Sequence, residues 1–242
     1  MDSELRKIAM EALKDPIVGE HQCQYCKQKF VRESTLAAHQ CEPKRRHQQK
    51  TEKGVMIGYQ AWIRFYELTQ GSAKTKTYDD FAKSQFYTAF VKFGRHCHGI
   101  NAINVDRFIE HVIKNNLKID HWCKDKIYEE YLLTLLKTEA AEDALARGVK
   151  IMDEWADEFQ QPLSEYFRQV SDGRFVHHVK NGRISPWVIY NCDSGQTKLG
   201  SISPESLNMI WQAIDPDFWA RKLKDYPADA EMSKQVLAAA GL

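Results

Sequence analysis

Near one end the chain reads Cys23-Gln-Tyr-Cys26-Lys-Gln-Lys-Phe30-Val-Arg-Glu-Ser-Thr-Leu36-Ala-Ala-His39. A Cys-x-x-Cys turn presents two thiolates to one ion, and a short helix further along can bring an imidazole to the same ion. Phe30 and Leu36 supply a small apolar core, because so short a segment cannot bury enough apolar surface without a metal. The spacing therefore predicts one structural Zn²⁺ within a small ββα unit.

The fourth ligand departs from the commonest spacing of such sites. Where a second histidine is usual, the chain has Pro43, Lys44 and Arg45. Because each helical residue turns by ~100°, Cys41 would point roughly 200° away from His39 in a continuing helix, so it can ligate only if the helix stops at about Gln40. Pro43 favours that stop, since it disfavours helix in the residue before it. We therefore expect Cys41 as the fourth ligand, with His47 as the alternative.

This frame resembles the Cys2His2-type zinc fingers, as a Cys-Cys-His-Cys variant over residues 20–47. The resemblance implies that the base-reading positions of the finger helix hold Arg32, Ser34, Thr35 and Ala38. An arginine at such a position suits a bidentate contact with guanine in the major groove, and one finger covers ~3 base pairs. The resemblance thus implies nucleic-acid binding of limited sequence specificity.

A longer part of the chain carries a second resemblance. The segments His39-Gln-Cys41-Glu-Pro-Lys-Arg-Arg, Gly58-Tyr-Gln-Ala-Trp62-Ile-Arg-Phe-Tyr66 and Phe93-Gly-Arg are similar to finger-bearing proteins encoded by large tailed bacteriophages. This implies a phage source, and hence the cytoplasm of the host cell, but no particular chemistry. Since no apolar run is long enough to span a membrane and the six cysteines suit a reducing compartment, we expect a soluble intracellular protein without a membrane partner.

Basic residues are concentrated around the predicted metal site. Residues 20–53 carry eight Lys or Arg against four Asp or Glu, a net charge of +4, whereas residues 138–170 carry three against eight, a net charge of −5. This separation favours a local contact with a polyanion over a uniformly basic protein. Segment 43–53 has no apolar period, and a solvated tether is its alternative interpretation. The residues expected to contact phosphates there are Lys44, Arg45, Arg46 and Lys50.

Apolar periodicity beyond the finger indicates a mainly α fold with a central helical bundle. Expected helix starts are Thr77, Asn104 and Asp120, and a long helix from Thr138 should end before Pro162. The aromatic residues within 59–66 recur at helical spacing, which favours core packing over a base-stacking platform. The predicted domains are an N-terminal helix in 1–19, the zinc finger in 20–47, a basic linker in 48–54, a helical domain in 55–161 and a small α+β module in 162–242.

In the last third of the chain, the expected structure changes from helices to short strands. Residues 175–179 and 184–190 flank Asn181-Gly182, and together they are typical of a β-hairpin with a type I′ turn. Residues 197–202 suggest a third strand. Ser203-Pro204 and Asp215-Pro216 are typical helix starts, with a capping residue followed by proline. We therefore expect a short meander followed by helices.

No motif indicates an enzyme. His177 and His178 would face opposite sides of a strand, and Cys192 lacks the neighbours that would activate a nucleophile. A second zinc site is a weaker hypothesis, because its donors lack the spacing of the finger and lie where helix ends explain them more simply. Its donors would come from His96, Cys97, His98, His121 and Cys123.

These observations predict a non-enzymatic protein in which one zinc finger and the basic tail bind nucleic acid, with DNA preferred over RNA. The helical body would position a protein partner. The main alternative is a protein-interaction adaptor with a structural finger, which a single finger and a net charge of only +1 favour. An unrecognised hydrolase or nuclease is a third hypothesis, because catalytic groups need not be close in sequence.

Overall fold

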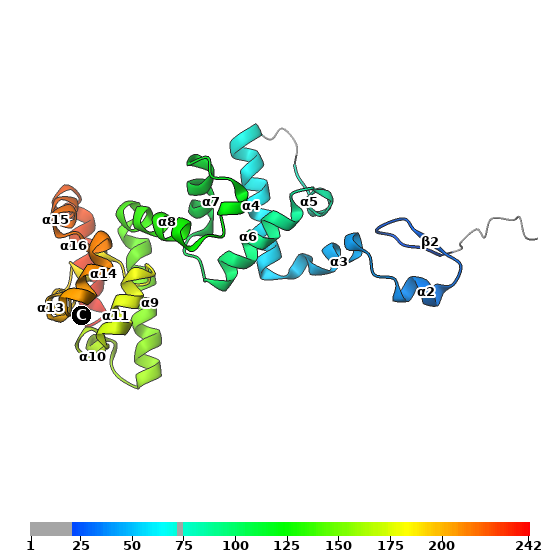
Figure 1. The fold of residues 1–242 in the computed structure, drawn as a ribbon. Coiled ribbons are helices and arrows are strands. Elements are labelled where there is room, and N and C mark those ends of the chain that lie inside the picture. The colour runs from blue at the N-terminus through cyan, green and yellow to red at the C-terminus, as the bar shows by residue number, and fades with distance from the viewer. Residues whose placement is uncertain (1–20, 72–74) are drawn as a thin grey trace, which may run out of the picture. The chain divides into compact units, whose positions relative to one another are not determined.

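The computed structural model describes residues 21–71 and 75–242, most of which are helical (Figure 1). The helix predicted in residues 1–19 lies outside the described residues. The chain divides into two compact units, residues 1–102 and 103–242. The prediction of a mainly α fold is confirmed. The predicted C-terminal strands are not present, because the strands among the described residues form a two-stranded sheet in the first unit.

The first unit begins with two short strands and a helix. β1 (His21–Gln22) pairs antiparallel with β2 (Lys29–Phe30), and His21 lies opposite Phe30. α2 (Glu33–Ala38) follows. His39 directly after α2 has an extended backbone with φ −66° and ψ 123°. The helix therefore stops before the second pair of predicted ligands, as the proposed role of Cys41 requires.

A second short helix follows at once. α3 (Glu42–Gln48) runs into a 3-10 turn, η1 (Gln49–Thr51), and α4 begins at Lys53. Pro43 lies in the first turn of α3, where its missing N–H costs nothing. Basic residues in the last turn complement the helix dipole. The segment in which the sequence has no apolar period is therefore helical over residues 42–51, with Pro43 in the first turn of α3.

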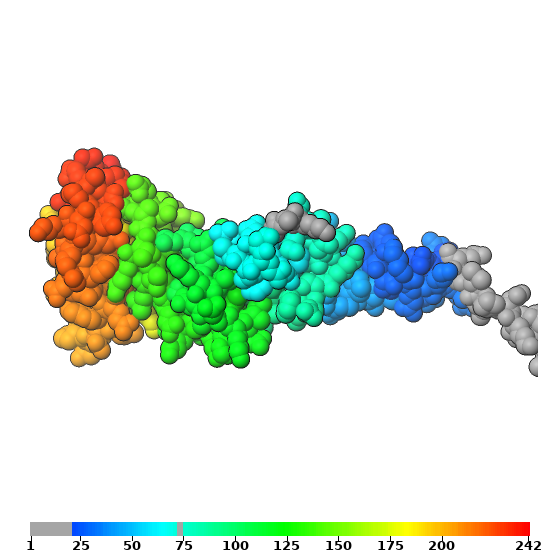
Figure 2. Space-filling model, turned by 90° about the horizontal axis from the view of Figure 1, so that it is seen from above, coloured from blue at the N-terminus to red at the C-terminus, as the bar shows by residue number. Residues whose placement is uncertain are grey.

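Three further helices complete the first unit: α4 (Lys53–Gln70), α5 (Tyr78–Lys83) and α6 (Tyr87–Gly99). Figure 2 shows their outer surface in cyan to green. Glycines let α4 and α6 pack closely. A Cβ on Gly94 would lie only 2.1 Å from the carbonyl oxygen of Gly54 and 2.4 Å from the amide nitrogen of Gly58. The burial of Trp62 and the capping box at Thr77 confirm the predicted aromatic core and helix start.

The second unit begins with four elements: α7 (Val105–Lys114), η2 (Ile119–His121), α8 (Asp125–Thr138) and α9 (Ala141–Phe159). The Asn104 side chain caps α7, as predicted. Asp120 instead lies in η2, and Lys124 is the residue that precedes α8. α9 ends at Phe159, before Pro162, which confirms the predicted end of the long helix.

A buried polar network connects α9 to residues 182–185. Glu139 is 4% exposed, and Arg147 donates to both of its carboxylate oxygens at 2.8 and 2.7 Å. Ser185 Oγ donates to the same carboxylate at 2.9 Å, and Arg147 Nε donates to the carbonyl oxygen of Gly182 at 2.7 Å. Each buried polar atom named here has a partner, so the network fixes the geometry of this region at little cost.

The remaining elements of the second unit are helical: η3 (Leu163–Glu165), α10 (Tyr166–Gln169), α11 (Asp172–Lys180), α12 (Pro186–Ile189), α13 (Asp193–Ser201), α14 (Pro204–Ile214), α15 (Pro216–Asp225) and α16 (Pro227–Ala239). Side chains of Ser203 and Asp215 accept amide hydrogen bonds at the starts of α14 and α15, which confirms both predicted caps. The predicted third strand at 197–202 was wrong, because α13 covers most of it.

The predicted β-hairpin at 175–190 was also wrong. Phe175, Val176 and Val179 are buried at helical spacing on α11, which packs against α14. Asn181-Gly182 ends this helix: Gly182 has φ +67°, its amide donates to the carbonyl oxygen of Val179 (2.9 Å), and the next amide donates to that of His178 (2.7 Å). Asn-Gly suits both a type I′ turn and this helix end, so the dipeptide alone does not separate them.

Candidate metal centre

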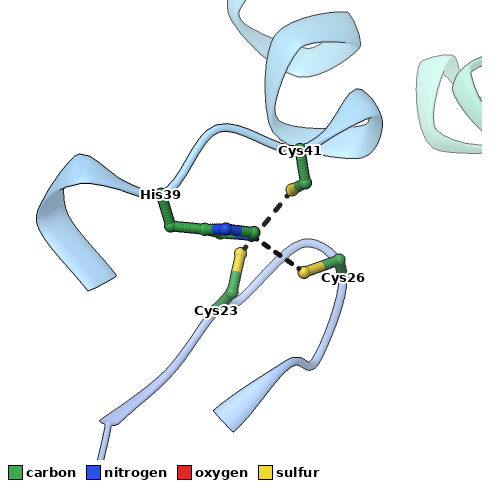
Figure 3. A group of neighbouring side chains, drawn as sticks. All are labelled: Cys23, Cys26, His39 and Cys41. Carbon is green, nitrogen blue, oxygen red and sulfur yellow. Dashed lines mark hydrogen bonds between the residues drawn. The ribbon is translucent and has the colours of Figure 1, made fainter. Parts of the chain in front are cut away.

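Cys23 and Cys26 lie on the turn between β1 and β2. The Lys27 amide donates to the carbonyl oxygen of Cys23, and the Cys23 amide donates to that of Gln28, both at 2.9 Å. Lys27 adopts the left-handed conformation (φ 63°) that closes the turn. The turn directs both thiols toward one point (Figure 3), as the Cys-x-x-Cys spacing predicts.

His39 and Cys41 come from the corner between α2 and α3. α2 ends at Ala38, and Cys41, with φ −126° and ψ 159°, is the N-cap residue of α3. Because the helix is interrupted, the two side chains do not diverge as they would on one continuous helix. They converge on the two thiols of the turn (Figure 3). The condition under which the sequence favours Cys41 is therefore met.

The four donor atoms lie within 4.8 Å of one another. Cys23 Sγ and Cys41 Sγ are 3.9 Å apart, and Cys26 Sγ and His39 Nε2 are 3.2 Å apart. In a tetrahedral zinc site, bond lengths of about 2.0–2.3 Å place ligand atoms roughly 3.5–3.8 Å from one another. A disulfide would require about 2.05 Å between the sulfurs. The cluster therefore has the dimensions of a closed four-ligand metal site.

The surroundings of the thiols also suit a cation. The Cys26 amide, which donates toward Cys23, lowers the pKa of the Cys23 thiol to about 7, although burial opposes this. Burial raises the pKa of the Cys41 thiol. The ring of His39 packs on Phe30 with centroids 4.7 Å apart. A divalent ion binds the thiolate forms and offsets the cost of burying their charge, so the donor set fits Zn²⁺.

His47, the alternative fourth ligand, lies outside this group. Its ring centroid is 5.1 Å from that of Tyr25, and its Nδ1 is 3.8 Å from Asp79 Oδ1. Within the described ranges, the four-donor cluster is the one group of three or more His, Cys, Asp or Glu side chains close enough to hold a metal. The donors of the hypothetical second site are not part of it: His96, Cys97, His98, His121 and Cys123.

The residues expected to read bases lie at the start of α2. Arg32 is the N-cap residue, and Ser34 and Thr35 lie in the first turn. All three are exposed, as is Ala38 at the end of the helix. The fold therefore leaves these side chains accessible to a ligand.

Two of the basic residues expected to contact phosphates instead contact groups of α3 or of the residues directly before it. Lys44 Nζ donates to the carbonyl oxygen of His39 at 2.9 Å. Arg45 pairs with Glu42 on the same helix. Lys50, in contrast, is exposed and forms no ion pair with another described residue.

Arg46 is the most constrained of the four. Its Nε is 2.9 Å from Glu42 Oε1, and its Nη1 donates to the carbonyl oxygen of Ala82 at 2.7 Å. The guanidinium lies 4.4 Å from the ring centroid of Tyr87, and the Tyr78 hydroxyl donates to the Arg46 carbonyl oxygen at 2.6 Å. Arg46 therefore connects α3 to α5 and α6. These contacts of its guanidinium compete with any contact to a phosphate.

Sequence reasoning missed two exposed lysines of the hairpin. Lys27 closes the Cys-x-x-Cys turn, and Lys29 lies on β2. Like Arg32, both are exposed and form no ion pair with another described residue. We call Lys27, Lys29 and Arg32 the hairpin cations. Their clustering between Cys26 and Glu33 was visible in the sequence.

The residues considered for catalysis have structural surroundings. His178 lies on α11, where its Nδ1 is 2.7 Å from the Tyr166 hydroxyl. Burial, followed by the nearby Arg174 charge, lowers the pKa of His178 to about 4. Cys192 is 5% exposed, and burial raises the pKa of its thiol. A buried protonated thiol is a poor nucleophile.

Comparison of the chain with models of protein families, with curated proteins and with solved structures finds no match in any of the three. Among the described residues, no helix combines the length and the apolar character needed to cross a membrane. The metal centre and the side chains around it are therefore the features of the molecule that bear on its function.

Proposed function

We propose that this protein binds nucleic acid through its metal-stabilised finger and that the helical body carries no catalytic activity. The observation that supports this is the accessibility of the hairpin cations, while Lys44 and Arg46 are held by other groups of the chain. An unpaired exposed cation gains most from a phosphate, because no internal ion pair has to be broken first.

In this proposal the metal is one structural Zn²⁺ per chain, held by Cys23, Cys26, His39 and Cys41. The bound ion would supply a fixed junction between the hairpin and the start of α3. The finger type and the phage source remain predictions from sequence resemblance. The proposed role of the ion is mechanical, since all four ligand positions would be filled by the protein and none left for a substrate.

DNA is the preferred ligand in this proposal. A short helix with Arg32, Ser34 and Thr35 exposed at its start fits the wide major groove of B-form DNA. The major groove of A-form RNA is too narrow for side chains to read. Arg32 would contact a base edge or a neighbouring phosphate, and the two lysines would contact phosphates.

A salt titration tests the proposal. Wild-type protein should bind random duplex DNA with an affinity that falls steeply with salt. Replacing the hairpin cations by glutamine (K27Q/K29Q/R32Q) should lower the log–log salt slope by up to about 3, one per lost phosphate contact. A control with the same charge change, K114Q/K118Q/K124Q, alters exposed lysines of the second unit and should leave the slope unchanged.

A protein-interaction adaptor with a structural finger is the second candidate. The observation that favours it is the set of Arg46 contacts, which join α3 to Ala82 and Tyr87 and thus integrate the finger into the first unit. The adaptor would bind a protein through its helical body. Absence of salt-sensitive binding to DNA or RNA at micromolar concentration would favour this candidate and contradict the first.

A further inference from the structure

A cleft of about 710 Å³ opens beside the Cys-x-x-Cys turn in the first unit. Its walls come from that turn, from α3 and from α5. The side chains on which its chemistry depends are Tyr25, Lys27, His47, Asp79 and Lys83. The metal centre uses none of them, and they form a separate set of aromatic and charged groups.

The walls of the cleft are fixed relative to one another. Arg46 Nη1 donates to the Ala82 carbonyl oxygen at 2.7 Å, and the Tyr78 hydroxyl donates to the Arg46 carbonyl oxygen at 2.6 Å, which joins α3 to α5. On the other side, the four-donor cluster links the turn carrying Cys26 to Cys41 at the start of α3. The cleft is thus built before a ligand arrives, and its shape depends on the metal centre.

The chemistry of the lining matches a nucleotide. The rings of Tyr25 and His47 lie 5.1 Å apart at 44°, and both side chains are half-buried. Lys27 and Lys83 are exposed at the cleft, where they can meet a phosphate. Asp79 is an exposed carboxylate, which can accept hydrogen bonds from the N–H groups of a base.

We infer that this cleft binds an unpaired nucleobase of a single-stranded nucleic acid, with its base on Tyr25 and its phosphates near the two lysines. The inference deepens the proposed function and rests on it. A base inside a duplex has both faces covered by its neighbours, so only an unstacked base can use an aromatic ring in this way. Stacking of this kind tolerates any sequence, because every base has a π-face.

Fluorescence anisotropy with a short labelled single strand, and with the duplex of the same sequence, tests this inference. Tyr25→Ala should weaken single-strand binding about tenfold, while Tyr25→Phe should preserve it, because stacking needs the ring and not the hydroxyl. Duplex binding should change little in either variant. Tyr226→Ala removes a 54% exposed tyrosine from the second unit and serves as the matched control.

Zinc content measured on each variant checks that the ring, and not the metal, was lost. If Tyr25→Ala loses zinc, Lys83→Glu on α5 replaces it as the test and should weaken single-strand binding severalfold in low salt. Equal single-strand affinity for the variant and the wild type would overturn the inference, as would an equal loss on duplex. Tyr25-dependent binding of a lysine-rich peptide instead of the single strand would also overturn it. Failure of the wild type to bind any nucleic acid would contradict the proposed function itself.

Discussion

The finger and the second unit hold their folds by different means. In residues 21–41, only Cys23 is a buried apolar residue, and four donor atoms converge within 4.8 Å. The second unit instead buries a cluster that runs from Leu136 to Leu237 and includes Trp155, Tyr166 and Phe175. A segment that cannot bury apolar surface obtains its stability from a metal, whereas a longer one obtains it from packing.

Because of this difference, loss of the metal should unfold residues 21–41 and leave residues 103–242 folded. The expected effects of substitution decrease from the finger ligands to a single histidine of the second unit.

Cys23→Ser should have the largest effect. Structural zinc sites contribute apparent binding energies of about 10–16 kcal/mol, so losing a ligand should unfold residues 21–41. Hydrogen exchange measured by mass spectrometry should show loss of amide protection there and unchanged protection in residues 103–242. Cys123→Ser, a thiol outside the cluster, should leave both regions protected. Equal loss in both regions would contradict the comparison.

Arg147→Met should have the next largest effect, and only in the second unit. It leaves the Glu139 carboxylate buried without its guanidinium partner, which should cost roughly 3–5 kcal/mol of unfolding free energy. Urea denaturation followed by tryptophan fluorescence measures this. Arg168→Met removes an exposed arginine that pairs with Glu165, and should cost less than about 1 kcal/mol. Similar costs for the two variants would show that the buried network contributes little.

The smallest expected effect is a dependence of the second unit's stability on pH. His178 has a pKa of about 4 in the folded protein, below its usual value of 6.5. The unfolded chain therefore binds the proton first as pH falls, and stability should decrease between pH 6.5 and about 4. The group is partly exposed, so solvent screening reduces the expected loss to about 1–2 kcal/mol.

Urea denaturation at neutral and acidic pH measures this loss. His178→Gln should reduce the difference between the two conditions, whereas His177→Gln, at an exposed neighbour whose charge contributes less to the lowered pKa of His178 than burial does, should change it much less. An unchanged pH dependence in His178→Gln would show that other groups cause the acid sensitivity.

The finger could be predicted from sequence because its constraint is local. A turn and a short helix bring the donor atoms of Cys23, Cys26 and His39 together, so their spacing encodes the geometry. The choice of Cys41 followed from the effect of Pro43 on the preceding residue. The same reasoning did not foresee α3, because proline is read as a helix breaker unless its place in the first turn is recognised.

The helices between residues 172 and 201 could not be predicted in the same way. The segment around Asn181-Gly182 has apolar residues on both sides of the dipeptide, and its turn signal serves a hairpin and a helix end equally. The packing of α11 against α14 decides between them, and that contact joins residues far apart in the chain. Likewise, the contact between Arg46 and Ala82, which competes with the predicted phosphate contact of Arg46, appears only in the folded first unit.

Zinc content per chain, measured by elemental analysis on wild type and two variants, tests the central claim most directly. We expect one zinc in the wild type, one in His47→Ala and a marked loss in Cys41→Ala, because Cys41 and not His47 lies within the four-donor cluster. Absence of zinc from the wild type would contradict the metal centre. Full zinc in Cys41→Ala with loss in His47→Ala would contradict the geometry on which the finger, the cleft and the proposed function depend.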